Sequence, residues 1–328
     1  LIIGVLSDTF GRKRFIVSGA ALALITSLLC AIAPNIGVLI AARFLQGLGS
    51  GACVVLARSI IPDITSGVAA AKAFSWMGII SGIAPAAAPV LGSLLVSSLG
   101  WRGIFYVLAG IAAAQLLVAL FVIPETRPPA NRTPLSFGSF TAVIKEPVFV
   151  RYALVVGFGF ASMFAYISAS SFVMQEIMGL SPQIFALVFG TNALGLMVGG
   201  ALNTRLLDRF PAAAILKIAL IIMTVAATIV LVCALTGLPR IPFFLALFFA
   251  IMPLSLVMGN ATALAVAAVR TRAGAASSVM GFGQFLLAGL VSPLVGMVGG
   301  SQAVGMGVCM VGAAVVAVIM FGLARRAG

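Results

Sequence analysis

The chain has 328 residues, of which 62% are apolar and only 8% are charged, whereas an ordinary soluble domain carries about 25% charged residues. So little polar surface cannot cover a water-soluble core of this size, and most of the chain must therefore lie in lipid. The net charge of +13 does not indicate nucleic-acid binding, because the basic residues fall in short groups between apolar runs. Histidine is absent, and no CxxC pair occurs among the cysteines, Cys30, Cys53, Cys233 and Cys309. We therefore expect no metal site, no cofactor and no enzyme built on histidine.

Ten segments are apolar enough to cross a bilayer as helices, which takes about 20 residues each. They are residues 15–33, 36–58, 70–96, 102–123, 148–174, 183–206, 212–235, 242–268, 274–298 and 302–323. This pattern predicts an all-α integral membrane protein. The basic residues gather in alternate loops, and only Arg102 and Arg240 fall on the opposite side. The positive-inside rule then places the basic loops and the C-terminus in the cytoplasm.

A Pro-rich basic segment, 124–147, separates four spans from the six that follow it. We expect it to be a cytoplasmic linker between an N-terminal bundle, 1–123, and a C-terminal bundle, 148–328. Many transporters consist of two six-helix halves that rock around a central site. Since the chain opens on Leu-Ile-Ile-Gly without an initiator Met, we expect the first helix and most of the second helix of such a fold to be missing.

The segment 4–14 reads Gly-Val-Leu-Ser-Asp-Thr-Phe-Gly-Arg-Lys-Arg. Its glycines allow a close helix approach and a tight turn, and Asp8 can meet a helix N-terminus, where the macrodipole favours an anion. The segment resembles the signature G-x-L-a-D-r-x-G-R-K of the major facilitator superfamily, with Thr9 where the family usually has Arg. The resemblance implies a conformational latch in which Asp8 faces the start of the eleventh helix, near 272–275, and which consists of Gly4, Asp8, Gly11, Arg12 and Lys13. The alternative is a solvated, basic determinant of topology.

Arg43 lies inside the apolar run 36–58. Placing a charged residue at the centre of a membrane helix costs about 2.5–3.5 kcal/mol on insertion scales, so Arg43 is a functional candidate. Alternatively, an arginine near the end of a span can extend to the interface. Residues 39–49 resemble the helix 4 motif of the same superfamily, l-x-x-R-x-x-Q-G-x-G. The resemblance implies proton coupling through Arg43, Gln46 and Gly47. Arg58 and Asp63 resemble the family's R-x-x-x-x-D, which favours a structural ion pair.

The segment 78–92 combines small residues, which let membrane helices pack closely, with two prolines, which kink a helix. It resembles a helix 5 antiporter motif through Gly82, Pro85, Pro89 and Gly92. Together with Gly-Trp-Arg-Gly-Ile-Phe-Tyr at 100–106 and Pro-Glu-Thr at 124–126, it is similar to the Bcr/CflA branch of the drug:proton antiporters. That branch contains bicyclomycin, sulfonamide and phenicol exporters.

Polar residues inside the later spans are the candidates for binding substrate. Ser162, Tyr166 and Ser170 are spaced at i, i+4 and i+8 and so share one helix face; the other mid-span polar residues are Asn192, Asn260 and Gln284. A few polar groups among apolar side chains suit a promiscuous site, although interhelical hydrogen bonds explain each of them equally well.

No Asp or Glu lies inside any predicted span. A proton-coupled exporter needs a carboxylate whose proton affinity burial adjusts. Either that carboxylate belongs to the missing first helix, or Asp8 or Asp63 takes part less directly.

These features predict a secondary exporter of drugs or other small amphipathic molecules that works by proton antiport and alternating access, as a monomer. Its partners would be a drug-like substrate, protons and the lipid bilayer, without nucleic acid. The alternatives are an exporter of an endogenous metabolite, such as an amino acid or a sugar, and a non-transporting fragment. A membrane-embedded enzyme would need a cluster of acid, base or metal ligands, which the sequence lacks.

Overall fold

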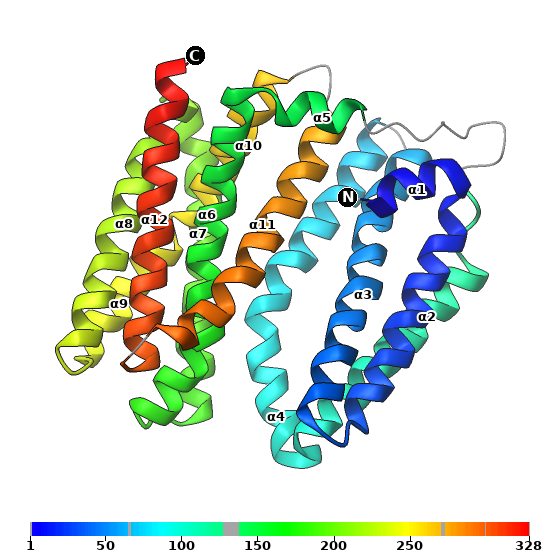
Figure 1. The fold of residues 1–328 in the computed structure, drawn as a ribbon, viewed down its shortest axis with the longest axis horizontal. Helices are drawn as coiled ribbons and strands as arrows, with labels where there is room; N and C mark the ends of the chain where they lie inside the picture. The colour runs from blue at the N-terminus through cyan, green and yellow to red at the C-terminus, as the bar shows by residue number, and fades with distance from the viewer. Residues whose placement is uncertain (1, 65–66, 127–137, 270–272, 299, 328) are drawn as a thin grey trace. The chain divides into compact units, whose positions relative to one another are not determined.

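A computed structural model describes residues 2–64, 67–126, 138–269, 273–298 and 300–327. The side chains at Asp8, Arg58 and 67–87, among others inside the helices, lie outside this description. The regular elements in the described ranges are all helical, as the sequence predicts (Figure 1). The chain divides into two compact units, Leu1–Ser136 and Phe137–Gly328, here called unit 1 and unit 2.

Unit 1 consists of α1 (Ile2–Phe10), α2 (Arg12–Ala31), α3 (Ile36–Ile64) and α4 (Gly67–Phe121). Helix α2 packs against both α3 and α4. The turn between α1 and α2 falls at Gly11, whose φ of 100° is accessible to glycine and strained for other residues. Helix α4 covers two predicted spans, and the chain bends between them at Gly100, where φ is 66° and ψ is 178°.

The helices of unit 2 surround a central one, α6 (Pro147–Ser171), which continues through a π-helical turn, Phe172–Ile177. Helix α6 packs against α10, α11 and α12. The remaining helices are α5 (Gly138–Ile144), α7 (Pro182–Leu207), α8 (Ala212–Leu235), α9 (Arg240–Ile251), α10 (Leu254–Ala268), α11 (Ala273–Met297) and α12 (Gln302–Ala327). Each of α6 and α7 begins with a proline at its first position, where a missing N–H costs nothing.

Two elements of unit 2 differ from the sequence-based expectation. The predicted span 242–268 is divided into α9 and α10 at Met252 and Pro253, because proline lacks the N–H that a continuous helix needs. The predicted linker 124–147 contains helix α5, which packs against α6 and α11. Val143 of α5 is fully buried, so this end of the segment is part of the core of unit 2.

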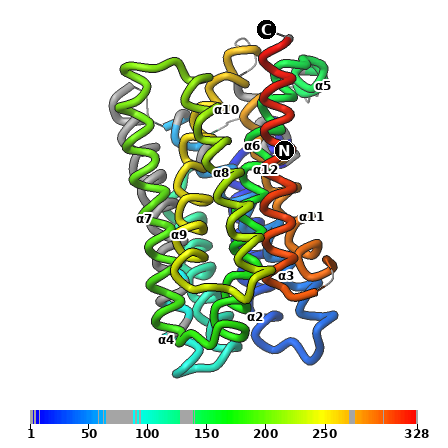
Figure 2. The backbone as a smooth tube through the Cα atoms, turned by 90° about the vertical axis from the view of Figure 1, so that its left-hand side faces the viewer, coloured from blue at the N-terminus to red at the C-terminus, as the bar shows by residue number. Residues whose placement is uncertain are grey.

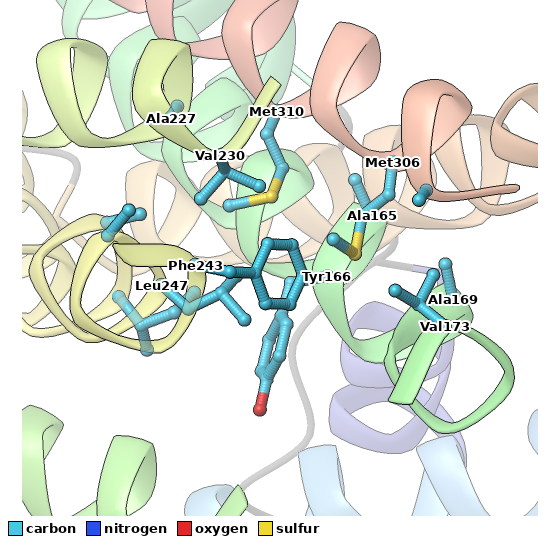
Figure 3. Packing of buried hydrophobic residues seen from close by; sticks show 14 of the residues in the cluster. Ala165, Tyr166, Ala169, Val173, Ala227, Val230, Phe243, Leu247, Met306 and Met310 are labelled. Atoms are coloured by element: carbon cyan, nitrogen blue, oxygen red, sulfur yellow. The ribbon is translucent and has the colours of Figure 1, made fainter. Parts of the chain in front are cut away.

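The core of unit 2 is rich in large side chains, as Figure 3 shows for Tyr166, Phe243, Met306 and Met310. The outward surface is also apolar. Along α8, for example, Ile218, Val225 and Val232 follow one another at seven-residue spacing and are 59%, 54% and 50% exposed. Nine spans in the described ranges are long and apolar enough to cross a membrane, with α9 and α10 counted together as Arg240–Ala268 and the second part of α4 as Leu94–Phe121. An apolar surface of this extent is stable against lipid and unfavourable in water.

Candidate functional site

A chain of hydrogen bonds in unit 1 runs from Arg43 on α3 to α2. Nη1 of Arg43 donates to Oε1 of Gln46 at 2.5 Å, and Nε2 of Gln46 donates to Oγ of Ser27 at 2.6 Å. The hydroxyl of Ser27 in turn donates to the carbonyl oxygen of Ala23 at 2.6 Å. Gln46 and Ser27 are buried, whereas Arg43 is exposed. The buried amide therefore holds one end of the guanidinium and ties it to the neighbouring helix.

The second half of α4 reaches the same region. The guanidinium carbon of Arg43 lies 5.8 Å from the ring centroid of Phe105, within the distance at which a cation interacts with an aromatic face. Arg102, three residues earlier, donates to the carbonyl oxygen of Ala33 at 3.2 Å and lies 4.1 Å from the ring centroid of Trp101. The segment 100–106, which the sequence identified only through its resemblance to one branch of the family, thus contacts both Arg43 and the turn that follows α2.

The backbones of α2 and α3 approach closely one turn beyond Gln46. A Cβ on Gly49 would lie 2.6 Å from the carbonyl oxygen of Gly19 and 2.8 Å from the backbone nitrogen of Ala23. Only glycine fits at this crossing. By contrast, a Cβ on Gly47 would meet nothing within 4 Å. Gly49 therefore sets the spacing of the two helices that carry Gln46 and Ser27, whereas the structure gives Gly47 no such role.

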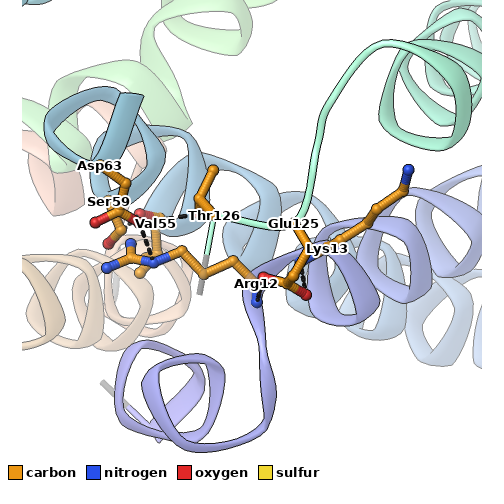
Figure 4. Close-up of polar contacts among 7 residues, drawn as sticks. All are labelled: Arg12, Lys13, Val55, Ser59, Asp63, Glu125 and Thr126. Carbon is orange, nitrogen blue, oxygen red and sulfur yellow. Dashed lines mark hydrogen bonds and ion pairs between the residues drawn. The ribbon is translucent and has the colours of Figure 1, made fainter. Parts of the chain in front are cut away.

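A second polar cluster joins three segments of unit 1 (Figure 4). Nε of Arg12, at the start of α2, lies 2.7 Å from Oδ2 of Asp63 near the end of α3. The hydroxyl of Thr126 donates to the same Asp63 oxygen at 2.9 Å. The side chains of Arg12 and Asp63 are only 6% and 13% exposed. Asp63 is thus paired with Arg12; the predicted ion pair between Asp63 and Arg58 is untested, because the side chain of Arg58 lies outside the described residues.

Glu125 completes this cluster by accepting hydrogen bonds from the first turn of α2. Its two carboxylate oxygens accept the backbone N–H groups of Arg12 and Lys13 at 2.9 and 3.3 Å. These N–H groups have no partner inside the helix, and the positive end of the macrodipole favours a carboxylate. The sequence placed Arg12, Asp63 and Glu125 in three separate motifs, and the fold brings them together.

Several predicted site residues fall where the structure gives no contacts. The side chains of Asp8, Gly82, Pro85 and Pro89 lie outside the description, as do Arg272 and the first side chains of α11. The expected approach of Asp8 to the start of α11 is therefore untested. Gly92 lies within α4, and a Cβ there would meet nothing within 4 Å.

The predicted substrate residues of unit 2 lie in at least two places. Asn192 on α7 donates through Nδ2 to the phenolic oxygen of Tyr166 on α6 at 3.0 Å, and the Tyr166 ring stacks on Phe189 at 5.5 Å. On the same face of α6, Ser162 donates to the carbonyl oxygen of Met310 on α12 at 3.2 Å. Ser170 donates to the carbonyl oxygen of Ile167, within its own helix.

Asn260 belongs to a different pair. Its Nδ2 donates to Oδ1 of Asn203 on α7 at 2.7 Å and to the carbonyl oxygen of Leu256 at 2.9 Å. Asn203 lies eleven residues along α7 from Asn192, about 16 Å at 1.5 Å per residue, so the two amide pairs are separate. Gln284 lies on α11 opposite Gly157 of α6. A Cβ added to Gly157 would lie 3.9 Å from the Cα of Gln284. Ser162 and Asn260 thus make interhelical bonds, and the sequence did not identify Asn203 as a partner.

The described residues contain no group of three His, Cys, Asp or Glu side chains that could hold a metal ion. The arrangement is instead that of a multi-pass helical membrane protein with polar networks inside each unit.

Residues 1–293 match the model of the Major Facilitator Superfamily, and the chain belongs to this family. It is accordingly a secondary transporter in a membrane rather than an enzyme. The fold agrees with solved transporters at low identity. A bacterial homologue of the human lysosomal transporter Spinster has a TM-score of 0.75 at 19% identity, covering 99% of this chain and 85% of that one. For the human organic anion transporter MFSD10 the TM-score is 0.67 at 18% identity, covering 98% and 79%.

Three bacterial relatives are similar to this chain in sequence. The chain is 35% identical over 99% of its length to the uncharacterized MFS-type transporter YdgK of Bacillus subtilis (strain 168), spanning 83% of that protein. It is 29% identical over 90% of its length to a bicyclomycin resistance protein homologue of Haemophilus influenzae, spanning 75% of it. It is also 32% identical over 59% of its length to the multidrug resistance protein MdtL of Escherichia coli, spanning 49%.

Proposed function

We propose that this protein exports drugs or other small amphipathic molecules across a bacterial inner membrane, in exchange for protons and by alternating access. The observation that carries the proposal is the network of Arg43, Gln46 and Ser27. It holds a guanidinium at a defined place within an apolar helix, where an unneeded charge would cost several kcal/mol on insertion. The names of two relatives, a bicyclomycin resistance protein homologue and a multidrug resistance protein, support a drug-like substrate.

Arg43 would couple proton entry to drug export through its charge. A fixed cation stabilises the ionised form of a carboxylate that approaches it. When a change of conformation or the arrival of substrate weakens that contact, the carboxylate can take up a proton. Because the amide of Gln46 fixes the planar guanidinium, lysine would preserve the charge at this position but not the geometry.

The motif residues of the first helices would control the conformational change. Gly4, Asp8, Gly11, Arg12 and Lys13 form the proposed latch, and the antiporter motif at 82–92 lies in α4. The positive-inside rule places the latch, the linker 124–147 and the C-terminus in the cytoplasm. On this proposal Asp8→Asn lowers transport while expression stays unchanged, and transport at the unmodified rate would remove Asp8 from the latch.

The test is efflux of a fluorescent drug from membrane vesicles with and without an imposed pH gradient. Arg43→Ala should abolish the stimulation by the gradient, Arg43→Lys should retain part of it, and the exposed Arg14→Ala should behave as the unmodified protein. Stimulation that persists in Arg43→Ala would show that protons take another path. A metabolite exporter is the second candidate, because the polar residues inside the spans do not by themselves distinguish a drug from an amino acid or a sugar. Gradient-stimulated export of an amino acid or a sugar, without export of the drug, would favour it.

A further inference from the structure

A hollow of about 490 Å³ lies between α8 and α12 of unit 2. The two helices pack against each other along the unit, and Figures 1 and 2 both show them side by side. Its lining comes from one end of each helix, from Lys217 to Ile221 on α8 and from Val318 to Arg326 on α12. The hollow therefore opens on a lateral surface of the unit, near the end where α8 begins and α12 ends.

The floor and walls of the hollow are apolar. Leu220 and Phe321 form part of the buried core beneath it. Ile221 and Val318 line it and are themselves exposed. At Gly322, which also lines the hollow, a Cβ would meet nothing within 4 Å. The hollow is thus an open apolar groove that can take a hydrocarbon chain.

Three basic residues, Lys217, Arg325 and Arg326, lie at one end of this groove, and the lining includes no carboxylate among the described residues. Arg325 and Arg326 occupy the last turn of α12, where the helix dipole favours cations. That explanation does not extend to Lys217, which is the sixth residue of α8, near the positive end of its dipole. The three charges converge from two antiparallel helices onto the same groove.

We propose that this groove binds an anionic phospholipid, with the phosphate among the three basic side chains and an acyl chain along the apolar wall. Lipid surrounds this surface in a multi-pass membrane protein. Its charged headgroup matches the basic end of the groove, and its acyl chain matches the apolar wall. A soluble phosphate would leave the apolar wall unused. A zwitterionic lipid would carry its own cation into a basic site. Basic pockets between helices at the cytoplasmic face recognise anionic headgroups in this way.

Native mass spectrometry of the detergent-purified protein, titrated with phosphatidylglycerol or phosphatidylcholine, tests the proposal. Each of Lys217→Gln, Arg325→Gln and Arg326→Gln should weaken phosphatidylglycerol binding about fivefold, the factor that roughly 1 kcal/mol per basic residue predicts. Phosphatidylcholine binding should be weak and unchanged. The matched control is Arg205→Gln with Arg209→Gln, two exposed arginines at the end of α7 that do not line the groove. Equal losses in the control and in the groove variants would overturn the proposal.

A separate variant tests whether an acyl chain occupies the apolar wall of the groove. Gly322→Phe keeps every charge and places an aromatic ring in the groove from a Cβ that meets nothing within 4 Å, so it should fold and still lose phosphatidylglycerol binding by about fivefold or more. Unchanged binding in Gly322→Phe would mean that the basic residues attract anionic lipid diffusely, and the groove would not be a site. Competition by glycerol phosphate at the same concentration as the lipid would identify a soluble anion as the ligand and also refute the proposal. Circular dichroism and the thermal midpoint confirm that each variant is folded.

Discussion

Removing the charge of Asp63 should destabilise unit 1 by about 3 kcal/mol. Exposed ion pairs contribute only about 0.2–1 kcal/mol, whereas loss of one partner from a buried pair costs roughly 3–5 kcal/mol, because the other charge stays buried. The Arg12–Asp63 pair is short, at 2.7 Å, and its side chains are 6% and 13% exposed. Because Arg12 is buried and Asp63 is only slightly exposed, the pair is closer to the buried kind, and the exposure of Asp63 places the expected loss of stability at the lower end of that range. Asp63→Asn is the suitable change, because its amide oxygen can still accept from the Thr126 hydroxyl.

The four cysteines provide the assay. Cys30 and Cys53 are buried in unit 1, and Cys233 and Cys309 belong to unit 2. With the latter two replaced by alanine, a thiol-reactive fluorescent dye reports the thermal opening of unit 1 alone. A loss of about 3 kcal/mol corresponds to a fall in the midpoint on the order of 10 °C. Arg14→Met, which removes an exposed charge two residues from Arg12, is the matched control and should stay within about 2 °C.

Replacing both Arg12 and Asp63 distinguishes the cost of leaving one charge buried from the contribution of the ion pair itself. The double variant Arg12→Met, Asp63→Leu leaves no buried charge and should lose less stability than Asp63→Asn alone, because apolar residues often substitute for a buried pair at little cost. If Asp63→Asn moves the midpoint no more than Arg14→Met, the pair is effectively solvated and the reasoning from its burial is wrong.

Two further predictions use the same dye. Gly49→Ala should destabilise unit 1 by about 1–3 kcal/mol, because its Cβ would lie 2.6 Å from the Gly19 carbonyl oxygen. The control is Gly51→Ala, whose Cβ would meet nothing within 4 Å and which should be neutral or stabilise by up to about 1 kcal/mol. Equal effects of the two changes would contradict the close crossing of α2 and α3. Tyr166→Phe, read through Cys233, should cost about 1–3 kcal/mol by leaving the buried amide of Asn192 without its acceptor, and adding Asn192→Leu should recover part of the loss. A change of the transport KM at unchanged stability would instead make this pair part of the substrate site.

The sequence by itself determined the class of protein and its helices. Long apolar runs cross a bilayer only as helices, since lipid offers no partner to an unpaired backbone group, so counting runs and sorting Lys and Arg by loops needed no tertiary information. The family followed from local spacing, as in 4–14 and 39–49, because a motif of ten residues is complete within the chain segment that carries it. The break at Pro253 is also encoded locally, although the sequence analysis predicted one continuous span over 242–268.

Only the tertiary structure decided which polar residues meet. More than fifty residues of chain separate Arg12, Asp63 and Glu125 from one another, and no local pattern pairs them. They meet because the start of α2, the end of α3 and the segment after α4 lie together. Likewise, Asn260 could have faced a cavity or a helix, and its bond to Asn203 follows from how α10 lies on α7. Lys217 and Arg325 line the same groove only because α8 and α12 pack antiparallel. Helical periodicity fixes the face on which a side chain lies, and packing alone fixes what that face meets.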